Sequence, residues 1–112
     1  MLQLSLQQKY FDDIKSGIKT AEGRCNSSKF ENIVVGDQIS FVCVQTQAVM
    51  VKTVTAINFY RNFKDMLVHE GVQNMLPGVT TIEQGVVIYE SFPGYKDKVV
   101  QVGAIAISIK AY

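Results

Sequence analysis

The sequence has no tryptophan, one histidine, two cysteines and two prolines among 112 residues, and its formal net charge is only +1. Two cysteines and one histidine do not make a four-ligand zinc site, so we expect no metal, and nothing indicates a cofactor. The low net charge argues against a long electrostatic contact with duplex nucleic acid, although it is compatible with a nucleotide or a short single strand. No apolar run reaches the roughly 18 residues of a membrane span, so no membrane partner is expected.

The N-terminal residues and the two cysteines indicate where the protein is located. The first residues, from Met1 to Ser5, have neither the charged start nor the apolar run of a signal peptide. We expect Cys25 and Cys43 to be free thiols, with Cys43 buried in a strand as a small apolar side chain. These features favour a reducing intracellular location, cytoplasmic or nuclear. The sequence leaves the oligomeric state and any protein partner open.

The composition is that of one globular domain over residues 1–112. Hydrophobic residues make up 47% of the chain and charged residues 19%, which is enough apolar material for one core and too much for a disordered chain. No linker, repeat or low-complexity segment interrupts it.

Apolar periodicity and capping signals predict the elements. The predicted strands cover residues 2–6, 38–45, 49–59 and 101–110, and the predicted helices cover 7–16, a short segment capped by Asn62, and 80–90. Thr80 and Glu83 form a capping box for the last helix, and residues 91–97 are predicted as a Pro/Gly loop. The final strand should place Ile105, Ile107 and Ile109 on one face. Strands with few helices favour an α+β, mainly β fold in which the sheet closes into a small barrel.

The segment from Ser16 to Arg24 joins a helix end to a further strand start. It carries an ammonium, a hydroxyl, a carboxylate and a guanidinium on Lys19, Thr20, Glu22 and Arg24. Because side chains alternate along a strand, the last three should point the same way, and Lys19 at the bend can turn toward them. An ion pair between Glu22 and Arg24 would still leave donors for a ligand. A surface ion pair on a polar strand face gives the same pattern, and the spacing alone does not separate the two interpretations.

This segment and its surroundings resemble the ASCH domain family of the PUA-like superfamily. The resemblance covers nearly the whole chain, and its motifs are Gly-x-Lys-x-x-Glu-x-Arg at 17–24, the Gly36-Asp37 strand start, Leu76-Pro77-Gly78 and the run from Glu83 to Tyr89. It implies a small PUA-like β-barrel with helices packed at its rim. It also implies a ligand cleft between the barrel and those helices, over the lysine, glutamate and arginine, and RNA or a nucleotide as the partner.

The residues expected to bind the ligand are Lys19, Thr20, Glu22, Arg24, Tyr60, Tyr89 and Tyr95. Lys19 and Arg24 would hold a phosphate, and Glu22 would accept from an amino or hydroxyl group. The three tyrosines are candidates for stacking on a base, and Tyr95 lies in the predicted 91–97 loop, which could fold over the cleft. Phe63 and Phe92 are assigned to the core, because aromatic side chains are more often buried there.

Two functions compete. The favoured one is a binding module for RNA or a nucleotide, in RNA metabolism or its regulation. The alternative is a small hydrolase, a ribonuclease or a modified-nucleoside amidohydrolase, using the same cleft with Lys19 and Glu22 as catalytic residues. In comparison with an N4-acetylcytidine amidohydrolase of the superfamily, the catalytic lysine of that enzyme corresponds to Lys19, but its threonine nucleophile corresponds to Glu22. Its catalytic glutamate has no clear counterpart, and Glu70 is only a nearby substitute. An interaction module without a ligand is a third possibility.

Overall fold

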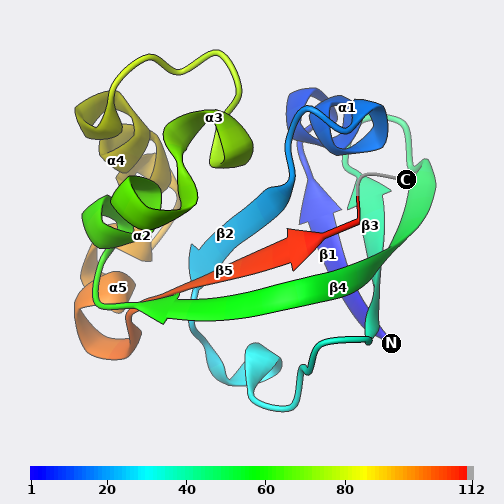
Figure 1. Cartoon of the computed structure of the whole chain (residues 1–112), viewed down its shortest axis with the longest axis horizontal. Coiled ribbons are helices and arrows are strands. Elements are labelled where there is room, and N and C mark those ends of the chain that lie inside the picture. The colour runs from blue at the N-terminus through cyan, green and yellow to red at the C-terminus, as the bar shows by residue number, and fades with distance from the viewer. Residues whose placement is uncertain (111–112) are drawn as a thin grey trace.

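The computed structural model describes residues 1–110, and its centre is a five-stranded sheet with the strand order β1-β3-β4-β5-β2. The strands are β1 (Leu2–Leu6), β2 (Ala21–Cys25), β3 (Gln38–Cys43), β4 (Val49–Tyr60) and β5 (Ala104–Ile109). β1 runs parallel to β3, and the other neighbouring strands are antiparallel. The sheet curls into a half-barrel (Figure 1) whose two edges are β1 and β2.

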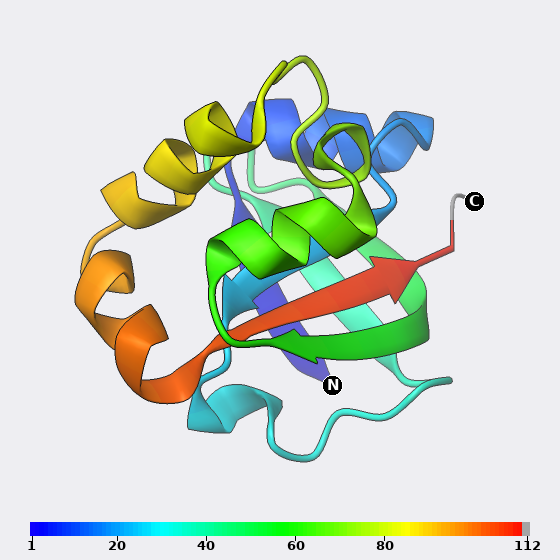
Figure 2. The same cartoon turned by 60° about the vertical axis from the view of Figure 1, so that its left-hand side comes forward.

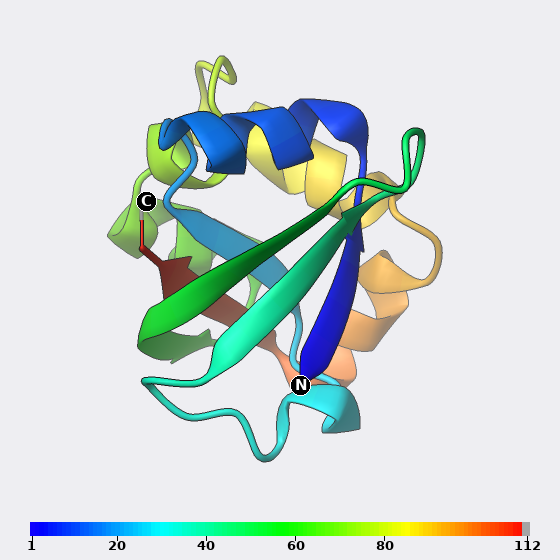
Figure 3. The same ribbon diagram turned by 90° about the vertical axis from the view of Figure 1, so that its right-hand side faces the viewer.

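The helices lie at the rim of this half-barrel, which confirms the predicted mixture of a barrel-like sheet with rim helices. They are α1 (Gln8–Ser16), the 3-10 turn η1 (Ser28–Phe30), α2 (Phe63–Glu70), α3 (Val72–Met75), α4 (Ile82–Ser91) and α5 (Tyr95–Val102). α2 to α5 are inserted between β4 and β5 and wrap around one side of the sheet (Figure 2). α1 lies across the end where β1, β3 and β4 converge (Figure 3). None of the helices within residues 1–110 has the length and apolar character that a bilayer crossing requires.

Side-chain alternation along β5 divides the core between the two faces of the sheet. Ile105, Ile107 and Ile109 lie in the cluster inside the half-barrel, as predicted, whereas Ala104 and Ala106 belong to the cluster under the helical layer. The small alanines allow α2 to pack closely over this strand. The free thiols are divided in the same way: both cysteines are buried, Cys43 in the first cluster and Cys25 in the second.

The predicted loop at 91–97 and the predicted start of the last strand at 101 are wrong. Tyr95 to Val102 form α5, and the strand begins at Ala104. Gly94, with a φ of 78°, is the residue at the helix N-cap, so the Pro93-Gly94 pair marks only the turn before the helix. Gly103, with a φ of 75°, then turns the chain into β5, and a Cβ there would lie 2.7 Å from the carbonyl oxygen of Tyr60.

The cap of α4 is one residue later than predicted. The Thr81 hydroxyl accepts a hydrogen bond from the backbone N–H of Gln84 at 3.1 Å, whereas the Thr80 hydroxyl donates to the Gln84 side chain. Thr80 with Glu83 and Thr81 with Gln84 both have capping-box spacing, so the sequence offered two equivalent registers. At α2 the prediction is confirmed, because the Asn62 side chain accepts from the Asp65 N–H at 2.8 Å.

The two threonines give a matched test of the α4 cap. We expect Thr81→Ala to lower the free energy of unfolding by about 1 kcal/mol, because a backbone N–H of the first turn loses its acceptor. Thr80→Ala, which removes only an exposed side-chain contact, should change it by less than about 0.5 kcal/mol. Urea unfolding of both variants measures the difference, and equal losses would contradict the assignment.

Candidate ligand-binding site

A pocket lies at the seam of the half-barrel, where the edge strands β1 and β2 approach each other without backbone pairing. Its walls come from both edge strands, the start of α1, and residues at the ends of α3, α4 and α5. The cavity measures about 210 Å³, and its lining is mostly apolar. The pocket therefore lies between the sheet and the helical layer, over the segment that the sequence analysis singled out.

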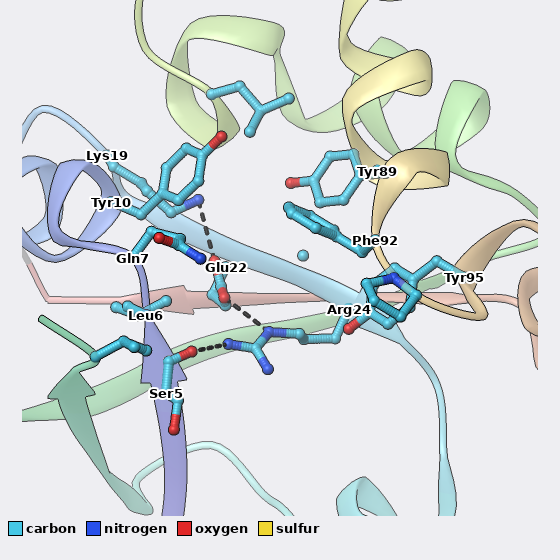
Figure 4. A pocket seen from close by; sticks show the side chains of 14 residues that line it. Ser5, Leu6, Gln7, Tyr10, Lys19, Glu22, Arg24, Tyr89, Phe92 and Tyr95 are labelled. Atoms are coloured by element: carbon cyan, nitrogen blue, oxygen red, sulfur yellow. Dashed lines mark hydrogen bonds and ion pairs between the residues drawn. The ribbon is translucent and has the colours of Figure 1, made fainter.

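Lys19, Glu22 and Arg24 meet in this pocket as a chain of ion pairs, here called the ion triad (Figure 4). The Lys19 Nζ lies 3.2 Å from Glu22 Oε1, and the Arg24 Nε donates to Glu22 Oε2 at 2.8 Å. A terminal guanidinium nitrogen of Arg24 then crosses the seam and donates to the backbone carbonyl of Ser5 at 2.8 Å. Arg24 thus links the two edges that backbone hydrogen bonds leave apart.

Lys19 is 1% exposed and Glu22 6%, so the segment does not form the surface ion pair that the sequence also allowed. Besides its ion pair with Glu22, the Lys19 Nζ donates to the carbonyl of Ala21 at 2.8 Å and to the carbonyl of Met75. These three acceptors match the three ammonium protons, so the protein itself uses all of them. Lys19 therefore acts on the pocket mainly by fixing Glu22.

The electrostatics of the ion triad follow from its burial. Burial would raise the pKa of the Glu22 carboxyl, but the charges and hydrogen bonds of Lys19 and Arg24 outweigh burial and hold that pKa below its ordinary value. Burial lowers the pKa of Lys19, against the opposing effect of Glu22. With the carboxylate ionised and both cations present, the triad contributes a net positive charge to an otherwise apolar pocket.

Aromatic side chains from the helical layer form the facing wall. The Tyr89 ring stacks on Phe63 with a centroid separation of 4.8 Å, and Phe92 packs edge-on against both Tyr89 and Tyr95. Tyr89, Phe92 and Tyr95 all line the pocket. Phe92 is therefore not simply a core residue, and Tyr95 reaches the pocket from the first turn of α5 rather than from a loop.

Thr20 and Tyr60 lie outside the pocket. β2 begins at Ala21, so the strand alternation that grouped Thr20 with Glu22 does not extend to it. Tyr60 lies at the far end of β4, where its hydroxyl donates to Glu70 and its ring stacks on His69. Glu70, which accepts this hydrogen bond, does not line the pocket either.

Gln7, Tyr10 and Gly23 are among the residues that line the pocket but were not predicted from the sequence. Tyr10 lies at helical spacing with Ile14 on the apolar side of the helix predicted over 7–16, and this pattern does not distinguish it from a core residue. Gly23 carried a usable signal, since a glycine inside a strand often marks a close approach of another group. Over the described range 1–110, no three His, Cys, Asp or Glu side chains are grouped so as to hold a metal ion.

The curled five-stranded sheet with rim helices, and a pocket between the two, define a PUA-like domain. Residues 4–111 match the family described as ASCH domain, and the chain belongs to that family. Comparison with the curated proteins gives no match.

Solved structures agree with this assignment. The crystal structure of hypothetical protein PH0355 is 37% identical, with a TM-score of 0.88 over 97% of this chain and 96% of that one. The solution structure of protein PF0455 from Pyrococcus furiosus is 36% identical, with a TM-score of 0.77 over 97% and 94% of the two chains. The crystal structure of ASCH from Zymomonas mobilis, at 17% identity, shares the fold with a TM-score of 0.65 over 96% of this chain and 65% of that chain.

The ion triad predicts a specific dependence of stability on pH. Because the folded-state pKa of Glu22 is depressed, its stabilising contribution is present above the ordinary carboxyl value of 4.5 and is lost as the pH falls through the lower folded value. Glu22→Gln leaves two buried cations without their counter-charge, so we expect a loss of about 3–5 kcal/mol at pH 7. That loss should shrink as the pH approaches 3.

The control is Glu31→Gln, which removes an exposed carboxylate next to η1 and should change stability little at any pH. Urea unfolding between pH 3 and 7 measures all three proteins. A Glu22→Gln difference that stays constant over this range would show that the carboxylate is not ionised in the folded protein.

Proposed function

We propose that this ASCH domain is a binding module for RNA or a nucleotide, and that the pocket at the seam holds one nucleotide unit. The observation that carries the proposal is the ion triad set into an aromatic-lined pocket: Lys19, Glu22 and Arg24 on one side, Tyr89, Phe92 and Tyr95 on the other. Such a pocket suits a ligand with a flat apolar body, a hydrogen-bonding edge and an anionic group, which describes a nucleotide.

Size and charge support a single unit. A cavity of about 210 Å³ is smaller than the roughly 300–1,000 Å³ typical of drug-sized ligands, so it accepts a base or nucleoside rather than several nucleotides. The net charge of +1 for the whole chain gives little long-range attraction, so affinity would come from the pocket itself. We expect the domain to act in RNA metabolism or its regulation, in an intracellular setting.

Within the ion triad, Arg24 is the residue most suited to meet a phosphate. Its Nε and one terminal nitrogen are bonded to Glu22 and Ser5, and its side chain is still 19% exposed. The Lys19 ammonium, predicted as a phosphate ligand, is already bonded to two carbonyls and a carboxylate. We therefore expect Lys19 to contribute through Glu22 rather than by direct contact.

The hydrolase remains the second candidate, because a buried carboxylate next to a lysine lines the pocket. The electrostatics support it less. A carboxylate whose pKa is held below its ordinary value accepts a proton poorly, which weakens Glu22 as a general base. Glu70, the nearest substitute for a second acid, is bonded to Tyr60 and Asn58 instead.

Substitution of Arg24 tests the binding function. Nucleosides, nucleoside monophosphates and short RNA are screened by NMR shift changes, and the ligands found are titrated by calorimetry. We expect Arg24→Ala to weaken affinity by about 1–3 kcal/mol, the range for losing a charged hydrogen-bond partner. Arg61→Ala is the matched control, since the Arg61 side chain is 85% exposed and pairs only loosely with Asp65 at 3.6 Å.

Two outcomes would count against the proposal. Equal affinities of wild type and Arg24→Ala would remove the ion triad from the binding site. Turnover of a bound ligand by the wild type that Glu22→Gln abolishes, with binding preserved in a variant that melting curves show to be folded, would establish the hydrolase instead.

A further inference from the structure

The Tyr89 hydroxyl is a buried polar group without a hydrogen-bond partner. Among the buried side-chain nitrogen and oxygen atoms of residues 1–110, it alone has none. Tyr89 is 2% exposed and lines the pocket, and Figure 4 shows its hydroxyl directed away from α4 toward Tyr10 and the ion triad. Buried polar groups are nearly always bonded, so this one requires an explanation.

The surroundings of Tyr89 prevent the hydroxyl from turning to another partner. Its ring lies almost parallel to Phe63, at 12°, and Phe92 packs against it edge-on at 79°. On the other side the hydroxyl rests on the backbone of Gly23, where a Cβ would lie only 2.7 Å from the phenolic oxygen. Because Gly23 has no side chain, the Tyr89 hydroxyl can approach β2 at the residue between Glu22 and Arg24.

The hydroxyl is also held in the form that donates. Burial, followed by the nearby Glu22 charge, raises the pKa of the Tyr89 phenol well above its ordinary value, so the proton stays on the oxygen at neutral pH. A phenylalanine would keep the same stacking without burying an unpaired oxygen. The Tyr89 hydroxyl therefore lowers the stability of the folded protein relative to phenylalanine. A bound ligand can supply the hydrogen-bond partner that this hydroxyl lacks.

We propose that the Tyr89 hydroxyl sets the specificity of the pocket by donating a hydrogen bond to a carbonyl oxygen of a nucleobase. Glu22 lies next along β2 and is an acceptor, so it suits the N–H that adjoins such a carbonyl in uracil, hypoxanthine and guanine. A site built to hydrogen-bond one ligand group rejects analogues that lack it, because its own group is then left unpaired. This inference rests on the proposed function and deepens it by naming the ligand edge.

The test compares Tyr89→Phe with wild type against three nucleosides: uridine, inosine, and purine riboside, which lacks both the carbonyl oxygen of inosine and the N–H that adjoins it. By calorimetric titration, Tyr89→Phe should bind uridine or inosine about tenfold more weakly, while its affinity for purine riboside stays that of the wild type. Its melting temperature should stay unchanged or rise, because the variant removes an unpaired buried oxygen.

Tyr60→Phe is the matched control. It removes a hydroxyl that is bonded, to Glu70, and that lies outside the pocket, so it should lower the melting temperature and leave nucleoside affinity unchanged. We expect Tyr89→Phe to lower affinity without lowering the melting temperature, and Tyr60→Phe to do the reverse. This pattern requires that the Tyr89 hydroxyl bonds the ligand and that the Tyr60 hydroxyl stabilises the fold.

The remaining outcomes separate this inference from the proposed function. Wild type and Tyr89→Phe binding uridine and inosine equally would overturn the role of Tyr89 and leave the binding module intact. Binding of short RNA but of none of the three nucleosides by the wild type would also overturn the role of Tyr89 and leave the binding module intact. A loss of stability in Tyr89→Phe like that of Tyr60→Phe would likewise overturn the role of Tyr89 only. No binding of nucleosides, nucleotides or RNA by the wild type would overturn both proposals.

Discussion

The buried ammonium of Lys19 connects the two layers of this domain. One nitrogen atom bonds a carbonyl of β2, a carbonyl at the end of α3 and the carboxylate of Glu22, so the sheet, the helical insertion and the pocket share one charge. A buried charge is tolerated only when its hydrogen-bonding capacity is filled. Here two of the acceptors belong to β2, and the third is a backbone carbonyl of α3. Both layers must be in position before this charge can be buried favourably, which ties the pocket geometry to the integrity of the fold.

The open seam explains why the pocket lies where it does. A fully closed barrel would fill the space between β1 and β2 with backbone hydrogen bonds, leaving no room for a ligand. In this domain the edges are bridged by Arg24 to the Ser5 carbonyl, and the space beside that bridge is covered by the aromatic wall. The charged groups of the pocket thus come from the segment at one strand edge, while most of its aromatic surface comes from helices that are distant in sequence.

Local patterns in the sequence were enough to predict most of the sheet and the meeting of Glu22 with Arg24 in the candidate site. The Ile105, Ile107 and Ile109 alternation identified the inner face of β5, and the spacing of Glu22 and Arg24 identified a shared direction on β2. The failures have physical causes. Pro93-Gly94 marks a turn whether a loop or a helix follows, so α5 was missed, and two overlapping capping boxes concealed the cap at Thr81. The burial of Lys19 depends on α3 covering it, which leaves no trace in local spacing. Gly23 inside β2 signals a close approach, but that the approaching group is Tyr89 depends on how α4 packs.

The strand pairing also has a consequence for when the site forms during synthesis. β2 carries Glu22 and Arg24, yet its ladder partner in the sheet is β5, with residues 21–25 paired to residues 104–108. Contacts between segments so far apart form late, because the intervening chain must first be ordered. On the ribosome, the nascent chain would carry the charged segment for most of its synthesis without a strand to dock against. The pocket is therefore complete only when β5 has emerged, so an incomplete chain lacks the proposed ligand site.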